Sequence, residues 1–412
     1  MKTIFVADRV WDGVADEAIA RGFVAIEGEK IEAVGRAADL PVGSTVTDLG
    51  DATLLPGLIN AHVHITFSSS RTVLDDYLSE KEGGVDVLTR RAEDNLQRAI
   101  GIGITTVRDL GTLNAVIFPM RERIRSGTFA GPDIIAAGEG ITSHGGHCYF
   151  FGIEAEGVDD LRAAVRRQRD AGAEVIKVFA TGGNLTPNTD PFSPQYSLEE
   201  LRAVVDEANA CSLHVASHAH APEGIRRSVA ANVSTIEHCF FDQPKGIEFD
   251  ERVVEEMAAK QITVVPTMGA SIRKFIDDPS LIDSVPEPGR TTLRRVAGRY
   301  KEIEANFRRM MEMGVRLIAG TDAGIPERTF DSLTDDLSMY SDDDHLGLGP
   351  RRALRSATSE AAAAIGVSDR GVLAPGKRAD LLAVDGDPLA TITDIGRTKL
   401  VVASGRPVGT AS

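Results

Sequence analysis

Short apolar runs alternate with amphipathic, helix-like stretches through the middle of the chain, between residues 56 and 365. The runs are rich in β-branched side chains, which is typical of buried strands. They predict eight strands, at residues 58–65, 104–108, 133–137, 175–180, 214–218, 235–238, 263–267 and 316–321. This order predicts an α/β fold, a (β/α)8 TIM barrel with functional residues at the carboxyl ends of its strands. A doubly wound open sheet is the alternative, although no GxGxxG turn follows the first strand.

Two local signals place element boundaries. Ser197 is followed by Glu200 at the spacing of a capping box, which predicts a helix over residues 197–210. Residues 27–30 lie between two apolar runs, as the turn of a β-hairpin would.

The two ends of the chain have a β-rich pattern that differs from the middle. Strand candidates occur in the first 55 residues and again at residues 379–384 and 399–403. Because short isolated pieces of sheet bury too little surface to be stable, we expect both ends to build one small β-sandwich. The predicted domains are therefore the sandwich, residues 1–55 and 366–412, and the barrel, residues 56–365.

Composition and charge restrict the partners. Asp and Glu number 61 against 45 Lys and Arg, and the formal net charge of −16 repels phosphate backbones and anionic lipids. We therefore expect a small-molecule substrate, and neither nucleic acid nor a membrane as partner. Asp8 interrupts the N-terminal segment before an apolar stretch long enough for a signal peptide, which predicts a cytoplasmic protein. The three cysteines form no CxxC pair, so a metal would be held by histidine and carboxylate.

Candidate metal ligands begin at the first barrel strand. His62 and His64 are two residues apart, and the alternation of a strand sends both side chains to the same face. Hydrogen-bonded structural histidines are the common alternative for such a pair. Lys177 lies inside the apolar run VIKVFA, where burial disfavours its charged form. Such a lysine either pairs with a carboxylate or, as a neutral amine, adds carbon dioxide to become a carbamate that can bridge two cations.

Three further candidates follow later strands. His218 ends the fifth strand, His238 ends the sixth, and Asp322 follows the eighth in GTDAG. Asp beside Gly is usually a turn or helix cap, but here Asp322 completes a circle of residues at strand ends. Glu237 precedes His238, and strand alternation predicts that it points outward into the helix layer.

Together these segments resemble the amidohydrolase superfamily with a binuclear metal centre. The resemblance rests on PGLINAHVHI, VIKVFATGG, VASHAH, IEHC and GTDAG, followed by GVLAPGKRADLLAVDGDPL. Within the superfamily, the spacing is similar to imidazolonepropionase-like proteins that include Xaa-Pro dipeptidases and other metallo-carboxypeptidases. The resemblance implies two divalent ions, usually zinc, bridged by carboxylated Lys177 and a hydroxide. It assigns His62, His64 and Asp322 to one ion and His218 and His238 to the other, with Asp322 as the catalytic proton carrier.

The substrate end of the site is less defined by sequence. Relatives carry a Gly-Gly-His loop that contacts substrate, which makes His147 the first candidate and His144 the second; a flexible loop with solvated histidines is the alternative. His220 lies in the loop after the fifth strand and is a third candidate. Phe240 and Phe241 stand where peptidase-like relatives often have an aromatic hydroxyl, and they suit an apolar acyl group.

A substrate carboxylate then needs another partner. The open choices are His147, His220, Arg273 and Arg328. The acidic run at residues 342–345 is interpreted as a solvated loop and not as a further metal site.

The leading hypothesis is a metal-dependent amidohydrolase that cleaves an amide C–N bond of a dipeptide or N-acyl amino acid. Alternatives are a mononuclear, imidazolonepropionase-like enzyme that opens a cyclic amide or deaminates a heterocycle, and a hydrolase of xenobiotic amides. A mononuclear enzyme needs no bridging carbamate, so Lys177 argues against it. A non-enzymatic barrel is disfavoured because every ligand position is filled. Oligomers are common in the resembling group, so a homo-oligomer is an open expectation.

Overall fold

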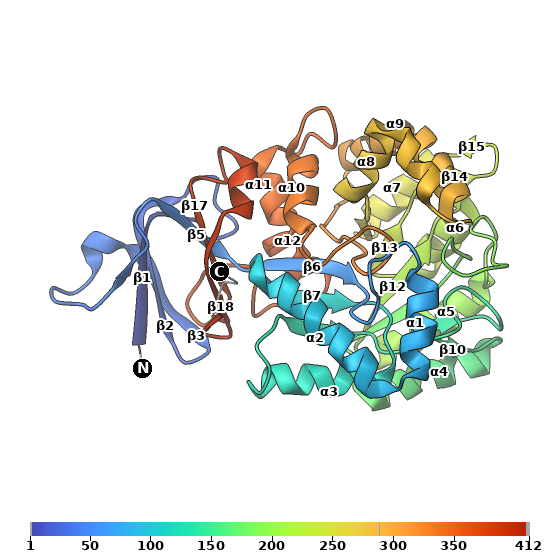
Figure 1. Cartoon of the computed structure of the whole chain (residues 1–412), viewed down its shortest axis with the longest axis horizontal. Helices are drawn as coiled ribbons and strands as arrows, with labels where there is room; N and C mark the ends of the chain where they lie inside the picture. Colours follow the sequence, from blue (N-terminus) through green and yellow to red (C-terminus); the bar gives the residue numbers. More distant parts are fainter. Residues whose placement is uncertain (1, 288, 409–412) are drawn as a thin grey trace.

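The computed structural model describes residues 2–287 and 289–408 (Figure 1). A β-rich part built from both ends of the chain lies at the left of the view, beside a larger part of strands and helices. The larger part combines parallel sheets with helices, and the chain therefore has an α/β fold.

The β-rich part is a single hydrogen-bonded sheet of eight strands. Seven follow the order β19-β18-β17-β5-β1-β2-β3, and β4 pairs with β1. An apolar cluster on this sheet joins Val24 and Leu54 from the first end to Leu381 and Val402 from the second. The strands are β1 (Lys2–Val10), β2 (Ile19–Glu27), β3 (Lys30–Arg36), β4 (Thr47–Asp48), β5 (Ala52–Pro56), β17 (Leu381–Asp385), β18 (Thr398–Ala403) and β19 (Arg406–Val408).

Two predictions for this part are confirmed. Both chain ends contribute to one sheet, and β2 and β3 form a hairpin in which Glu27 pairs with Lys30. Gly28 in the turn has a φ of +58°, a left-handed conformation that glycine adopts without steric penalty. The arrangement of this sheet as a two-layer sandwich stays a prediction.

The larger part contains two parallel sheets and a short hairpin. The sheet orders are β6-β7-β8 and β10-β9-β11-β12-β13-β16, and β14 pairs with β15. The strands are β6 (Leu58–Val63), β7 (Ile104–Asp109), β8 (Asp133–Ala136), β9 (Ile141–Thr142), β10 (Ile153–Glu154), β11 (Val175–Phe179), β12 (His214–Ala219), β13 (Thr235–His238), β14 (Asp242–Gln243), β15 (Gly246–Ile247) and β16 (Thr263–Val265).

Seven of the eight predicted strands appear as β6, β7, β8, β11, β12, β13 and β16. The eighth, residues 316–321, is less regular and forms one β-bridge, between Leu317 and Val264. Its backbone still bonds to both neighbours, because Ile318 N donates to Val264 O at 3.1 Å and Ala61 N donates to Ala319 O at 3.0 Å. A backbone bond of 2.9 Å from Glu174 N to Ala136 O joins the two parallel sheets.

Helices connect and cover these strands. Ser197 and Glu200 form the predicted capping box at the start of α5, which confirms that helix. Within residues 2–287 and 289–408, none of the helices has the length and apolar character needed to cross a membrane. The α-helices are α1 (Val73–Glu82), α2 (Val85–Gly101), α3 (Asn114–Arg125), α4 (Val158–Ala171), α5 (Leu198–Ala210), α6 (Pro222–Ala231), α7 (Glu251–Ala259), α8 (Ala270–Asp277), α9 (Gly289–Glu312), α10 (Leu333–Ser341), α11 (Gly349–Ser356) and α12 (Ser359–Ala364); the 3-10 helices are η1 (Ala37–Asp39), η2 (Pro279–Ser284) and η3 (Ile392–Gly396).

The segment from α8 to the start of α9 has a small apolar core of its own. Phe275 of α8 packs with Ile282 of η2 and Val285, and Leu293 of α9 packs against them. This cluster is separate from the main core that joins the strands to the other helices. The segment therefore has a cluster of its own in addition to its contacts with the main core, which include Ile272 and Leu293.

Candidate functional site

The six predicted metal ligands line one cavity of about 380 Å³. Lys177 lies in the middle of β11, the other five lie at or directly after the carboxyl end of a strand or of the 316–321 segment, and all six are buried. We call these side chains the floor of the cavity: His62, His64, Lys177, His218, His238 and Asp322.

Asp322 lies close to both His62, which is in β6, and His64, which directly follows β6. Its Oδ1 atom is 3.4 Å from Nε2 of His62 and 3.4 Å from Nε2 of His64. Two ligands of a tetrahedral zinc, each about 2.0–2.1 Å from the metal, are separated by about 3.3 Å. The bond from Asp322 N to His62 O, 2.8 Å long, ties the two segments together. The distance from Asp322 to each of the two histidines is therefore one that a shared divalent cation would allow.

A second group of histidines follows β12 and β13, which are neighbouring parallel strands. Nε2 of His238 is 2.9 Å from Nδ1 of His218, and the His220 ring stacks on His238 with 4.4 Å between ring centroids. His218, His220 and His238 form one potential metal-binding triad, and His62, His238 and Asp322 form another, each with ligand atoms within 4.8 Å of one another. His220 therefore lies as close to the second group as the two predicted ligands do.

Glu237 corrects one prediction. It does not point outward: its side chain is 0% exposed, and its Oε2 accepts a hydrogen bond of 2.9 Å from Nδ1 of His62. Strand alternation fails at the next residue, because His238 has a φ of +71° and Cys239 N donates to Glu237 O across it, as in a γ-turn. Glu237 and His238 therefore both face the interior, although they are adjacent in sequence.

Lys177 is 1% exposed, and its Nζ has no hydrogen-bond partner among the described residues. Burial lowers the pKa of Lys177 to about 8, because the charged ammonium is disfavoured away from water. Nζ also lies 5.2 Å from the centroid of the Phe179 ring. A buried amine without a partner is the kind of group that a carbamate and its cations would satisfy.

Burial favours the neutral, metal-binding form of five cavity histidines, His62, His147, His218, His220 and His238, by lowering their pKa. Burial lowers the pKa of His62 to about 4 and lowers those of His147 and His220 to about 3. Burial alone raises the pKa of Asp322, but His62 and His64 beside it outweigh that effect and hold the pKa below its usual value. The floor thus brings buried nitrogen donors together around one carboxylate.

The two candidate histidines of the Gly-Gly-His loop have different positions. His147 is buried, lines the cavity and packs on His218 with 4.8 Å between ring centroids. A Cβ atom at Gly183 would lie 2.2 Å from His147 Nε2, so this glycine makes room for the ring. His144 is 65% exposed, lies near Glu154 and is not among the described residues that line the cavity. Its position gives no support to a contact with substrate.

The outer part of the cavity is apolar. We call its side chains the wall: they come from α8, from the segment after η2, from α9 and from the loops after β11, β13 and the 316–323 segment. They are Leu185, Phe240, Ile272, Phe275, Val285, Leu293, Val296 and Ile325. Phe241 is not part of the wall, because it is buried against Phe249 with 5.4 Å between ring centroids. The wall was not predicted from sequence, apart from Phe240.

Arg328 and Arg273, two of the carboxylate candidates, are separated by the structure. Arg328 lines the cavity, and its Nη1 donates to the backbone oxygen atoms of Thr267 and, at 3.0 Å, Thr321. Arg273 pairs with Asp277 at 3.1 Å and contacts His345, outside the described cavity lining. His345 is itself buried, and its Nδ1 bonds to Glu304 at 2.5 Å, so it does not belong to a solvated acidic loop.

Sequence reasoning missed Arg108, which is 1% exposed and pairs with Glu237 at 3.0 Å. An arginine near the end of the predicted buried strand at residues 104–108 was the available signal, because such a charge needs a buried partner.

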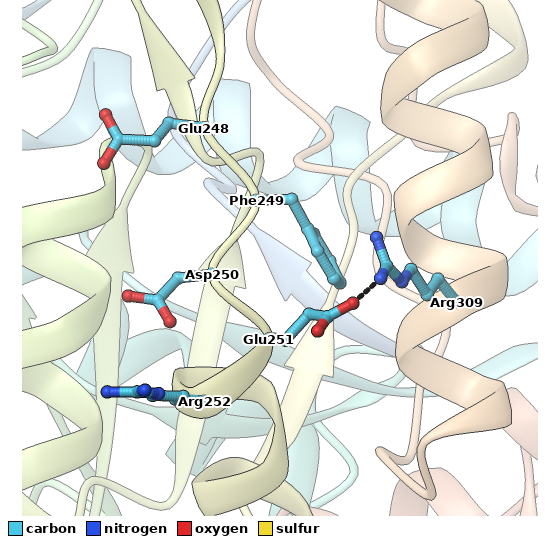
Figure 2. A pocket seen from close by; sticks show the side chains of 6 residues that line it. All are labelled: Glu248, Phe249, Asp250, Glu251, Arg252 and Arg309. Atoms are coloured by element: carbon cyan, nitrogen blue, oxygen red, sulfur yellow. Dashed lines mark ion pairs between the residues drawn. The ribbon is translucent and has the colours of Figure 1, made fainter.

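A second hollow lies on the surface beside α7 and α9. Figure 2 shows the ion pair between Glu251 and Arg309, with Phe249 next to the arginine, while Glu248, Asp250 and Arg252 point elsewhere. Arg309 also lies over the Phe249 ring at 4.9 Å. These contacts join α7 to α9 on the outside of the protein, and no histidine or lysine lines the hollow. The histidine-lined cavity is therefore the candidate site.

Comparisons with known proteins agree with this geometry. The chain is 26% identical to ochratoxinase from Aspergillus niger over 93% of this chain and 82% of the relative. It resembles the crystal structure of a Xaa-Pro dipeptidase with bound methionine, with a TM-score of 0.84, 29% identity, and 99% and 100% of the two chains covered. It also resembles a prolidase complexed with N-methylphosphonate-L-proline, with a TM-score of 0.84, 27% identity and 99% of both chains covered.

The model of the amidohydrolase family matches residues 53–408, which include every residue of the cavity floor. The resemblance stated from the sequence motifs is thereby confirmed. The chain is a hydrolytic enzyme and belongs to the amidohydrolase family.

Proposed function

We propose that this enzyme hydrolyses an amide C–N bond in a small molecule that carries a free carboxylate, namely a dipeptide or an N-acyl amino acid. The observation that carries the proposal is the convergence of six buried ligand-type side chains at the floor of one cavity. Similar proteins described as a Xaa-Pro dipeptidase, a prolidase and an ochratoxinase support the reaction class.

The metal assignment has two parts. His62, His64 and Asp322 would hold one divalent cation, and the 3.4 Å spacings of their ligand atoms support this. His218 and His238 would hold the second, with His220 near enough to take part. Bound there, two such ions, zinc in our proposal, would polarise the amide carbonyl and increase the acidity of the attacking water.

Lys177 would join the two cations as a carbamate. Its neutral amine forms an N–C bond to carbon dioxide and releases one proton, so the buried nitrogen becomes part of an anion with two oxygen ligands. The position of Nζ in the cavity, without another partner among the described residues, supports this modification.

Asp322 and His147 would act on the substrate. Asp322 is the one carboxylate of the floor, so it would accept a proton from the attacking water and return it to the leaving nitrogen. His147 lines the same cavity beside His218 and would donate a hydrogen bond to the substrate. The wall would take the apolar part of the acyl group or amino acid.

The domain arrangement belongs to the same proposal. We infer that residues 56–365 close as a (β/α)8 barrel, with residues 1–55 and 366–412 as a second domain. Backbone bonds of residues 316–323 to both β16 and β6 support closure. In such a barrel the floor lies at the carboxyl ends of the strands, where catalytic residues of this architecture collect.

The test of the function is a substrate panel assayed with protein reconstituted with zinc. We expect turnover of N-acyl amino acids or dipeptides, and loss of turnover in Asp322→Asn with the fold retained by circular dichroism. A lactam and an ester of similar size are included. Opening of the lactam without cleavage of any linear amide would overturn the proposal in favour of a cyclic amide hydrolase.

Arg328 would bind the substrate carboxylate. Of the three basic side chains in the described lining, Lys177 belongs to the floor, and Arg71 pairs with Glu327 at 2.5 Å. Arg328 is fixed by backbone carbonyl groups, which leave its charge uncompensated by hydrogen bonding to a carboxylate.

Substrates with a free or amidated carboxyl group test this role. We expect Arg328→Met to raise KM about 10- to 100-fold for the free acid, because a charged hydrogen bond is lost, and to change KM little for the amide. Arg71→Met is the matched control at the rim. An equal rise in KM for the free acid and for the amide would contradict a contact between Arg328 and the substrate carboxylate.

A further inference from the structure

A fully buried ion pair lies behind His62, on the side away from Asp322. Arg108 of β7 and Glu237 of β13 are 1% and 0% exposed, and Nη2 of Arg108 is 3.0 Å from Oε1 of Glu237. The other carboxylate oxygen, Oε2, accepts from Nδ1 of His62 at 2.9 Å. Arginine, glutamate and histidine from three strands therefore form one continuous chain of hydrogen bonds.

The remaining polar atoms of the pair are also bonded. Nε of Arg108 donates to Ala61 O at 2.6 Å and Nη1 donates to Thr235 Oγ1 at 3.1 Å, while the Thr235 hydroxyl donates to Glu237 at 2.6 Å. Arg108 and Thr235 thus hold the carboxylate of Glu237 in one orientation. His62 is the third donor to the same carboxylate.

Stability alone is a weak explanation for this arrangement. Removing two charges from water is expensive, and apolar residues of similar volume often replace a buried ion pair without loss of stability. The network is different from an isolated pair because it ends on a side chain of the cavity floor. Its orientation toward His62 therefore suggests a role in the site.

Other floor histidines have neutral partners at the corresponding nitrogen. Nδ1 of His64 donates to Gly111 O at 3.2 Å, and Nδ1 of His238 is 2.7 Å from the Thr267 hydroxyl. The Gly111 carbonyl can also only accept a hydrogen bond, and the Thr267 hydroxyl can donate or accept, but of the three partners the carboxylate alone carries a full negative charge. A carboxylate on Nδ1 fixes the proton there, leaves the lone pair on Nε2 and makes that nitrogen a stronger donor.

We propose that Glu237, held in place by Arg108, is a positioning residue that fixes the tautomer and ring orientation of His62, so that Nε2 binds a divalent cation together with His64 and Asp322. This inference rests on the proposed function, because it assumes a cation at the floor. It adds two residues, from β7 and β13, that do not reach the cavity lining.

The Glu237→Gln variant tests the proposal. Glutamine has nearly the same shape, but its amide offers one oxygen. When that oxygen accepts from Arg108 and Thr235, the NH2 group faces His62 and requires Nδ1 as the acceptor. The proton then moves to Nε2, the nitrogen that the cation needs. We expect the tighter Zn²⁺ site to weaken about 10- to 100-fold, measured by competition with a chromogenic chelator.

Two further readouts separate positioning from a structural role. Nitrogen-15 NMR of the metal-free protein, with His62 assigned by its loss in His62→Gln, should show the Nδ1–H tautomer in wild type and Nε2–H in Glu237→Gln. Thermal unfolding of the metal-free proteins reports any general loss of stability. Thr235→Val, which removes one donor to Glu237, keeps the test usable if the glutamine variant does not fold, and should weaken Zn²⁺ binding by about 2- to 5-fold.

Asp133→Asn is the matched control. Asp133 is also 0% exposed and pairs with arginines, with Arg370 at 2.8 Å and Arg378 at 2.9 Å, but it lies at the start of β8 and contacts no floor residue. We expect it to lower the melting temperature and leave Zn²⁺ affinity unchanged.

Unchanged Zn²⁺ affinity and tautomer in Glu237→Gln would overturn the inference, as would equal weakening in Asp133→Asn. These outcomes differ from failure of the proposed function, in which the wild type itself would neither bind Zn²⁺ nor hydrolyse amides.

Discussion

The floor and the wall of the cavity are built in different ways. Floor side chains come from hydrogen-bonded strands or from the residues that directly follow them, and these strands are connected to the main core. Much of the wall comes from the segment between α8 and α9, which has its own small apolar cluster. This segment also packs on the main core, through Ile272 and Leu293, and makes polar contacts such as Lys274 with Glu327 and Ala270 N with Asp336. The difference indicates that the reaction depends on the rigid part, whereas substrate selection depends on a part that can change with less effect on the fold.

The largest effect is expected when the floor loses Lys177. In Lys177→Ala, turnover should fall by about 1,000-fold or more, because the proposed carbamate and the charge stabilisation that depends on it are absent. Metal analysis should show fewer than the two ions per chain that we propose for wild type. Lys81→Ala is the control, because its Nζ bonds to Phe150 O and lies outside the described cavity lining. Full activity in Lys177→Ala would contradict a bridged site.

Gly183→Ala tests whether the reaction tolerates a displacement of His147, which packs beside the floor. The new Cβ atom would lie 2.2 Å from His147 Nε2, so the ring must move. We expect kcat to fall about 10- to 100-fold, because a shift of about 1 Å in a substrate-contacting group has effects of this size. Gly298→Ala in α9 is the control, since its Cβ atom would meet open space. Unchanged kcat in Gly183→Ala would remove His147 from the site.

A change in the wall should affect selectivity more than rate. Leu293→Ala removes apolar contact area, so KM for a substrate with a large apolar acyl group should rise about 5- to 10-fold, with little change in kcat. KM for a substrate with a small acetyl group should not change in Leu293→Ala. Leu281→Ala is the matched control: Leu281 packs against the same small cluster but is not among the described lining residues. Equal effects of both variants would mean that the wall acts only through its stability.

The smallest effect concerns the attachment of the wall. Burial raises the pKa of Asp336 to about 7, against the opposing effects of the Ala270 hydrogen bond and Arg328. The folded pKa exceeds the unfolded value of about 3.9, so protonated Asp336 favours the folded protein. This contribution to the free energy of unfolding is complete below about pH 3.9 and is lost as the pH rises through 7. Asp336→Asn should therefore melt at a higher temperature than wild type at pH 8, by roughly 2 °C, and not at pH 4. If the difference in melting temperature between the two proteins stayed the same from pH 4 to pH 8, Asp336 would not titrate in this range.

Much of the floor was predictable because its signals are local. His62 and His64 lie two residues apart at a strand end, and Asp322 directly follows the last predicted strand. Seven predicted strands are present within one or two residues of their expected ends. The eighth has weaker regularity, because its pairing with β16 is limited to a single bridge.

The errors have physical causes that a pattern does not contain. Glu237 was assigned to the wrong face because alternation assumes extended backbone, and the left-handed conformation of His238 interrupts it. His144 and His147 stand on either side of the same Gly-Gly pair, yet only His147 is buried, and its backbone N donates to Gln195 at 2.6 Å. The wall depends on how α8 and α9 pack over the strands, and no sequence period specifies that contact.

The position of β5 has a consequence for synthesis of the chain. β5 pairs with β1 on one side and with β17, from residues 381–385, on the other. Only Gly57 separates β5 from β6, and Gly57 N donates to Asp380 O at 3.0 Å. β5, which leads directly into the strand that carries His62, therefore gains its second neighbour only after nearly the whole chain has left the ribosome, so a chain cut short before β17 should emerge without a fully formed metal-binding pocket.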